Sequence, residues 1–195
     1  DITFNELLGF TEKDVSDILD YYISVGELKI DKTEAMSIIK KWYDHYIFSA
    51  EASKSVHNSD AILYFVNKAI RAKKIPENLI DDNLRMDYGK LRYLILKDRE
   101  LNGNFQKLSD IIRDNGIESN IRTSFPFDKI THKENFISLL YFFGLLTYSN
   151  KPATSLPFLC IPNETIKQMI FEYIRSSFEE AYDFSMDIYE LLLLV

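Results

Sequence analysis

The side chains of this sequence that most readily do chemistry are three histidines and one cysteine: His45, His57, His132 and Cys160. The histidines fall on separate expected elements, and none has a second metal ligand at helical spacing. We therefore interpret them as solvated or hydrogen-bonded side chains. Cys160 lies in an apolar stretch, where a small core residue is expected rather than a nucleophile. A single cysteine also excludes an internal disulfide and a multi-cysteine zinc site.

Glu27 and Lys29 have the spacing of the Glu-x-Lys half of a metal-dependent nuclease motif. Such a site also needs an acidic residue on a neighbouring strand, because two carboxylates and a carbonyl hold the divalent ion. The preceding acid, Asp20, is expected on a helix and lies too close in sequence to fold back in a hairpin. A small nuclease acting through Glu27 and Lys29 is therefore only a third hypothesis.

Basic residues gather between Lys68 and Arg99, in a chain whose net charge is −7. An acidic chain is a poor nucleic-acid scaffold as a whole, yet a local basic surface can still contact phosphates. Acidic residues dilute the group, so a solvated helix surface is one interpretation, and a contact to phosphate or to an acidic neighbouring domain is the other. The candidate contact residues are Lys68, Arg71, Lys73, Lys74, Lys90 and Arg92.

Two common catalytic signatures are missing from the sequence. Its six glycines are scattered, so no glycine-rich loop can surround a phosphate with backbone N–H groups. There is also no Gly-x-Ser-x-Gly nucleophile elbow. We therefore expect no catalytic residue, no metal and no cofactor within this chain, and no enzymatic activity of its own.

Helix-capping signals and helical spacing of apolar residues predict a mainly α-helical chain. Thr11 and Asp14 form a capping box for a helix that runs to about Tyr22 and is broken by Gly26. The other expected helices are one begun by residues 31–34 whose apolar spacing includes Ile47, one over residues 59–72, one over 85–97, a short one from Phe105 closed by Asn115-Gly116, one begun by a capping box at 131–134, and a last one capped by Asn163. Residues 49–59 are expected to be a polar loop, and 101–104 a turn.

The apolar period changes after the helix that starts near residue 134. Residues 145–148 and 158–161 predict two short strands joined by a loop, while 117–125 is ambiguous between a strand and a loop. From residue 105 onward this order is typical of a winged-helix-like unit. A DNA-reading winged helix needs cations on the helix before the wing. Residues 134–143 contain none and are apolar around most of the helix, so we expect that helix to be buried.

The expected fold is mainly α, with a helical, lid-like subdomain over residues 1–100 and a winged-helix-like subdomain with a small β hairpin over 101–182. Residues 183–195 would start the connection to a further domain. The hydrophobic fraction of 46% is enough for a core, and the charged fraction of 27% is ordinary for a soluble protein. No apolar run is long enough for a membrane span, and no secretory pattern opens the chain, so we expect a cytoplasmic protein. The Asp1 start and the apolar end at 191–195 favour a piece of a longer protein over a complete one with a docked last helix.

Several short stretches, distributed over nearly the whole chain, share their order and spacing with a known family. They are residues 4–12 (FNELLGFTE), 41–48 (KWYDHYIF), 62–65 (ILYF), 87–92 (DYGKLR), 101–105 (LNGNF), 134–147 and 161–165 (IPNET). Together they resemble the middle region of bacterial AAA-ATPase-like proteins that carry a C-terminal PD-(D/E)xK nuclease-type domain. The family pattern usually continues Trp-Tyr-Asp with Gly-Tyr-Arg-Phe, and here His45 and Ile47 replace the glycine and the arginine. It also has Tyr-Asn-Pro where this chain has residues 57–59, His-Asn-Ser. No nucleotide-sensing role is therefore assigned to Ile47.

The resemblance implies an ATPase-like core with a phosphate-binding loop before this region and a nuclease-like domain after it. ATP and Mg²⁺ would belong only to that core. The chain would then be a non-catalytic regulatory and coupling region whose partners are the neighbouring domains of its own parent chain, with a homo-oligomer left open and no membrane contact. The alternative is a nucleic-acid-binding winged-helix module that uses the basic residues between Lys68 and Arg99.

Overall fold

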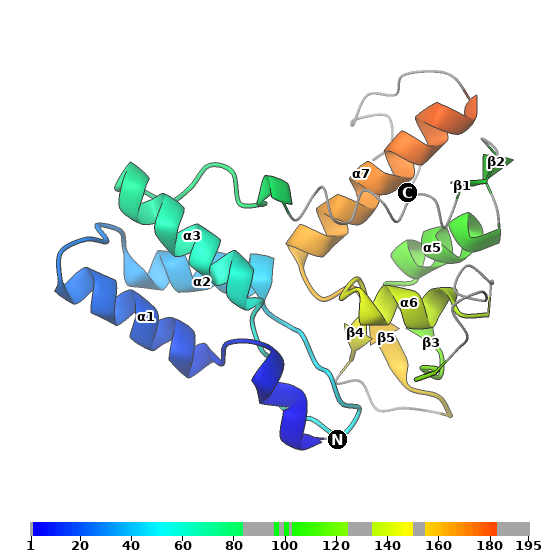
Figure 1. Cartoon of the computed structure of the whole chain (residues 1–195), viewed down its shortest axis with the longest axis horizontal. Coiled ribbons are helices and arrows are strands. Elements are labelled where there is room, and N and C mark those ends of the chain that lie inside the picture. Colours follow the sequence, from blue (N-terminus) through cyan, green and yellow to red (C-terminus); the bar gives the residue numbers. More distant parts are fainter. Residues whose placement is uncertain are drawn as a thin grey trace. The chain divides into compact units, whose positions relative to one another are not determined.

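A computed structural model describes residues 2–83, 96–97, 100–101, 103–124, 134–149 and 155–182 of the chain. Over these residues the fold is mainly helical, with a small antiparallel sheet, as the sequence predicts (Figure 1). Contacts divide the chain into two units: unit 1 is Asp1–Asp82 with Pro162–Thr165, and unit 2 is Asn83–Ile161 with Ile166–Val195. These units are defined by contacts within the chain and do not test whether a domain boundary lies at residue 100, so that boundary stays a prediction.

Three helices form the core of unit 1, preceded by a short 3-10 helix. The elements are η1 (Ile2–Leu8), α1 (Glu12–Ser24), α2 (Lys32–Tyr43) and α3 (Ser59–Ala72). Apolar residues at intervals of three and four positions give each helix one apolar face, and these faces pack together. Val15 and Leu19 of α1, Ile39 of α2, and Ile62 and Phe65 of α3 are fully buried in one cluster.

The helix ends of unit 1 follow the capping signals of the sequence. The Thr11 hydroxyl accepts a bond from the Asp14 backbone N–H, and the Asp14 carboxylate accepts one from the Thr11 N–H, which confirms the predicted capping box. The second helix ends at Tyr43, not beyond Ile47, so the expected helical position of Ile47 is wrong. Asp44 is already extended and His45 has a φ of 74°, which no α-helix accommodates.

A two-stranded hairpin replaces the end of the predicted fourth helix. Strands β1 (Leu96–Lys97) and β2 (Glu100–Leu101) pair antiparallel, with Leu96 opposite Leu101. Residues 84–95 of that predicted helix lie outside the described residues. The expected turn at 101–104 is also wrong, because Leu101 is in β2 and Gly103 begins the next helix. Strands of two residues are too short for an apolar period to reveal them.

Besides the β1–β2 hairpin, unit 2 contains three helices and a three-stranded sheet in its described part. They are α5 (Gly103–Arg113), β3 (Ile117–Glu118), α6 (Phe136–Phe142), β4 (Thr147–Tyr148), β5 (Phe158–Cys160) and α7 (Glu164–Tyr182), the first two residues of α7 being grouped with unit 1. The sheet has the order β3-β5-β4 and is antiparallel, and the pairing of β4 with β5 confirms the predicted hairpin. The segment 117–125, which is ambiguous from the sequence, begins with the strand β3. Asn115, with a φ of 57°, ends α5 as expected.

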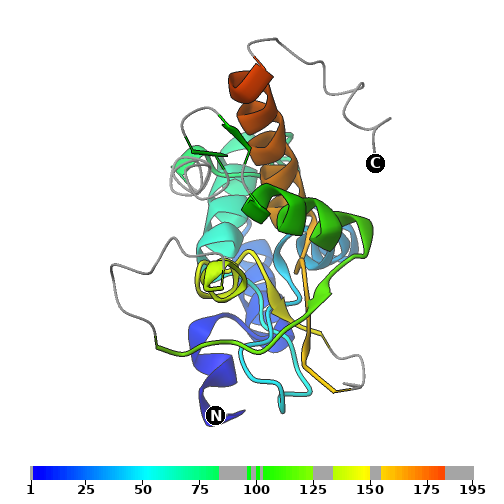
Figure 2. The ribbon, with the colours of Figure 1, turned by 90° about the vertical axis from the view of Figure 1, so that its right-hand side faces the viewer.

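Packing in unit 2 buries the helix that precedes the hairpin. The five residues that open α6, from Phe136 to Leu140, are all buried, as its apolar circumference predicts. The expected burial does not extend to the end of the helix, because Phe142 and Phe143 are exposed. The capping residues 131–133 expected before it lie outside the described residues. The ring of Tyr141 contacts that of Tyr148 at 5.3 Å between centroids, which joins α6 to β4. Helices α5 and α7 lie side by side in both views, where the rings of Phe105 and Phe178 are 6.2 Å apart (Figures 1 and 2).

Candidate functional site at the buried Asp44–His57 junction

The segment between α2 and α3, residues 44–58, is a loop that backbone pairing closes and that is partly buried. Two antiparallel bridges hold it, Tyr46 with Val56 and Phe10 with His57. The Asn58 N–H donates to the Tyr43 carbonyl at 2.9 Å, so a hydrogen bond joins the two ends of the loop. A polar loop is expected at residues 49–59 and a loop is found up to Asn58, with Val56 and His57 buried in it.

Asp44 and His57 are the buried ionisable pair of this loop, with 4% and 2% of their surfaces exposed. The His57 Nδ1 lies 3.8 Å from Asp44 Oδ1 and 3.2 Å from the Phe10 carbonyl oxygen. That same Asp44 oxygen accepts a hydrogen bond from the Ser55 hydroxyl at 2.8 Å. The buried carboxylate is thereby held by one hydroxyl and faces one imidazole.

Burial lowers the pKa of His57 below its ordinary value, because a charged imidazolium is poorly solvated there. The Asp44 carboxylate and the bond to the Phe10 carbonyl oppose this shift but do not reverse it. His57 is therefore neutral near pH 7, with the proton on Nδ1 where it can donate to Phe10. Its other nitrogen, Nε2, is buried and has no hydrogen-bond partner among the residues that the structure describes.

Two asparagines tie other segments to this loop. The Asn5 amide donates to the Lys54 carbonyl at 2.9 Å, and its oxygen accepts from the Phe48 N–H at 2.8 Å, which fixes η1 against the loop. The Asn163 amide donates to the Asp44 backbone carbonyl at 2.9 Å, across 119 positions of sequence. Asn163 belongs by contacts to unit 1 and directly precedes α7.

The junction (Asp44, Ser55, His57 and Asn163) has the residue types of a hydrolytic triad but not its connections. In a triad the serine hydroxyl gives its proton to the imidazole, and the carboxylate orients that imidazole. Here the Ser55 hydroxyl donates to Asp44 instead, and the His57 Nδ1 is directed at a backbone carbonyl. The arrangement ties backbone segments together, and within these four residues no hydrogen bond joins the serine hydroxyl to the imidazole.

Four of the six basic candidates lie together at the C-terminal end of α3. Lys68 and Arg71 are exposed on the helix, Lys73 is its C-cap with a φ of 52°, and the Lys74 ammonium pairs with Glu77 at 2.5 Å. The other two, Lys90 and Arg92, lie outside the described residues.

The remaining candidates are not brought together. Glu27 and Lys29 are exposed in the segment after α1, where no strand forms, so the framework of a nuclease motif is missing at that point. His45 is exposed and His132 lies outside the described residues. Cys160 is in β5 as expected, but it is half-buried rather than in the core.

The junction itself was not anticipated from the sequence, because Asp44 and His57 are thirteen positions apart with no motif between them. One signal was present: the apolar residues Ala52 and Val56 interrupt the polar loop, and both are buried.

Two searches of the structure gave no further site. Within the described ranges, no three His, Cys, Asp or Glu side chains are grouped so as to hold a metal ion. No helix in that same part of the chain combines the length and the apolarity that crossing a membrane requires.

Comparisons with known proteins identify no family for this chain. Nothing matches the chain among protein-family models, curated proteins or solved structures.

Proposed function

We propose that this chain is a non-catalytic coupling region, which transmits movement to α7 through the segment that precedes this helix. The observation that carries the proposal is the hydrogen bond from Asn163 to the Asp44 carbonyl. It anchors the residue before α7 to the buried loop of unit 1, while the helix from Ile166 onward is grouped with unit 2.

The anchoring segment, Pro162–Thr165, has the properties of a firm attachment. Pro162, Asn163 and Thr165 are buried, and Asn163 donates to the Asp44 carbonyl, two positions before the Tyr46–Val56 bridge. Breaking such a bond leaves a buried carbonyl unsatisfied, which costs roughly 1–3 kcal/mol. An α-helix transmits displacement along its length because every turn is hydrogen-bonded to the next. A shift of the loop would therefore displace the start of α7.

The resemblance described above supplies the wider context of the proposal. In such a parent protein, nucleotide in an ATPase-like core would shift the helical part, and the winged-helix-like part would pass the shift to a nuclease-like domain by rigid-body rotation. ATP and Mg²⁺ would bind in that core and not in this chain. A DNA-reading role is less well supported, because α6 has no cation to offer a base or a phosphate.

The test is hydrogen exchange in the parent protein, compared with and without ATP. Coupling predicts that nucleotide changes the exchange of residues 44–58 and of α7. Replacing Asn163→Ala should abolish the change in α7 and leave nucleotide binding intact. The matched control is Gln168→Ala, an exposed position of the same helix, which should behave as the wild type.

Two results would refute the proposal. One is an exchange pattern in this region that does not respond to nucleotide. The other is catalysis by the purified chain alone, such as Mg²⁺-dependent cleavage of DNA that Glu27→Ala abolishes.

A further inference from the structure

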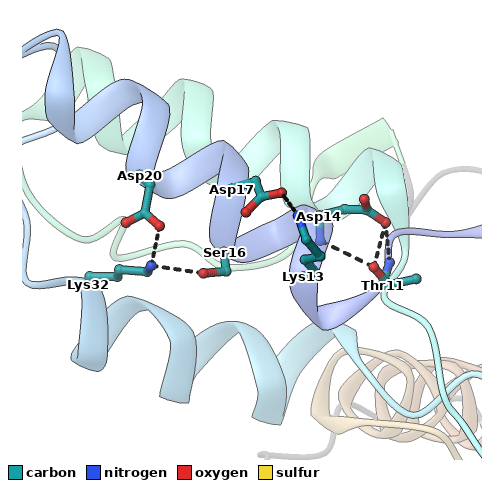
Figure 3. A network of polar contacts seen from close by, with 7 residues as sticks. All are labelled: Thr11, Lys13, Asp14, Ser16, Asp17, Asp20 and Lys32. Carbon is teal, nitrogen blue, oxygen red and sulfur yellow. Dashed lines mark hydrogen bonds and ion pairs between the residues drawn. The ribbon is translucent and has the colours of Figure 1, made fainter.

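Three exposed aspartates of α1 provide a comparison for the cations of α3. Asp14, Asp17 and Asp20 of this helix each have a partner within the unit (Figure 3). The contacts are Asp14 with Thr11, Asp17 with Lys13, and Asp20 with Lys32, whose ammonium also donates to Ser16. The charges of these three aspartates are thus balanced or hydrogen-bonded locally.

Three cations lie close together in sequence on the exposed side of α3. Lys68, Arg71 and Lys73 make no ion pair with any residue that the structure describes. The Lys68 ammonium lies over the ring of Tyr64, 5.4 Å from its centroid, and so has an aromatic neighbour but no acid. Three cations therefore remain uncompensated within about two turns of helix.

The helix dipole explains only part of this group. Cations are favoured in the last turn of a helix, which accounts for Arg71 and for Lys73 at the C-cap. It explains Lys68 less well, since this residue lies four positions before the last helical residue. It does not explain Leu63, whose side chain is 52% exposed. Leu63, Asn67 and Arg71 follow one another at four-residue spacing and so share one side of α3.

We propose that the α3 basic face (Leu63, Asn67, Lys68 and Arg71) docks an acidic, amphipathic protein helix. Carboxylates at intervals of three or four residues would meet Lys68 and Arg71, and one apolar side chain would cover Leu63. This inference rests on the exposed cations and the exposed leucine of α3, and it does not depend on the coupling role proposed above.

Nucleic acid fits the same face less well, for two reasons. The Tyr64 ring is already covered by Lys68, and a phosphate backbone offers nothing to an exposed leucine. A long polyanion also extends beyond the screening distance of about 8–10 Å and meets the rest of a chain whose net charge is −7. A short acidic helix interacts only with the local basic face.

The experiment is fluorescence anisotropy with the full chain and four labelled probes. The first probe is an 18-residue helical peptide with Glu at successive i, i+4 positions and Leu along one edge, and the second has every Leu replaced by Ala. The third and fourth are a 20-nucleotide single strand of DNA and its duplex. We expect the Leu-containing peptide to bind more tightly than the other three probes.

The variants locate the binding surface. Lys68→Glu with Arg71→Glu should weaken binding of the Leu-containing peptide roughly tenfold or more, since two charge pairs become repulsive. The matched control is Lys40→Glu with Lys41→Glu, which changes the same net charge at exposed positions near the end of α2 and should alter binding less than twofold. Leu63→Ser should weaken the Leu-containing peptide and leave the Ala-containing peptide unchanged.

Three results would overturn the inference. They are equal effects of the two charge-reversed pairs, tighter binding of either DNA than of the Leu-containing peptide, and no detectable binding of that peptide by the wild type at low salt.

Discussion

At the scale of single residues, His57 determines how unit 1 responds to acid. Its imidazole is buried, neutral and unpartnered at Nε2, so the folded chain takes up a proton there only at a free-energy cost. The charged and titratable groups around it are Asp44, Glu12 and His45, and the attraction of the two acids does not outweigh burial. The folded pKa therefore lies below the ordinary value near 6.5.

The sign of the pH dependence follows directly. The unfolded chain binds a proton at His57 before the folded chain does, so the stabilisation is complete above pH 6.5 and is lost as the pH falls below it. The expected slope from this residue approaches 1.4 kcal/mol per pH unit at most. Urea unfolding midpoints between pH 7.5 and 5.5 measure it.

The variant His57→Asn should flatten this slope, since it keeps a donor close to Nδ1 but cannot titrate. His45→Asn is the control, because His45 is exposed and an asparagine tolerates its positive φ. A slope in His57→Asn as steep as that of the wild type would show that other groups cause the acid sensitivity.

At the scale of elements, a glycine sets how closely α1 approaches the loop of the junction. A Cβ atom at Gly9 would lie 2.5 Å from the His57 carbonyl oxygen and 2.8 Å from Val56 Cγ2. We expect Gly9→Ala to destabilise the protein by about 1–3 kcal/mol, because the backbone bridge between Phe10 and His57 must open to admit the methyl group. Thermal or urea unfolding measures this.

Gly26→Ala provides the comparison at the other end of α1. A Cβ there meets nothing within 4 Å, and only the φ of 75° opposes it. Its cost should stay near 1–2 kcal/mol, from the left-handed backbone alone. Because these two ranges overlap, the sharper readout is the exchange rate of the His57 amide, which Gly9→Ala should raise and Gly26→Ala should leave unchanged. Equal rates in both variants would contradict the close approach.

Sequence alone anticipates the elements that are set by local chemistry. The starts of α1 at Thr11 and of α3 at Asn58 follow from side chains that accept bonds from helix N–H groups, and the left-handed Asn115 follows the end of α5 at Arg113. It fails where long-range contacts decide. The residues around His45 do not predict that α2 ends before it. The polar residues 49–59 do not predict that Asn5 and His57 close the loop over a buried carboxylate.

The candidate site could be anticipated even less, since its members come from distant parts of the chain. Asn163 is predicted only as the start of the last helix, and its bond to the Asp44 carbonyl depends on the fold returning to unit 1 at that point. The basic residues of α3, by contrast, are visible in the sequence because they share one helix. What the sequence does not show is that Lys68 and Arg71 lack acidic partners among the described residues.

At the scale of the whole molecule, the account depends on whether Pro162–Thr165 transmits changes in unit 1 to α7. A double-mutant cycle isolates this effect. Ile39→Val loosens the unit 1 core by about 0.5–1.5 kcal/mol without a change of charge. Asn163→Ala removes the bond to the Asp44 carbonyl, and Gln168→Ala on the exposed side of α7 is the control background.

The decisive measurement is native-state hydrogen exchange of α7 in these variants, read by mass spectrometry. Coupling predicts that Ile39→Val accelerates exchange in α7 roughly two- to tenfold in the wild-type and Gln168→Ala backgrounds, and has little effect once Asn163→Ala is present. If Ile39→Val leaves α7 exchange unchanged in the wild type, or accelerates it equally in all three backgrounds, the segment before α7 does not transmit and the proposed coupling role is wrong.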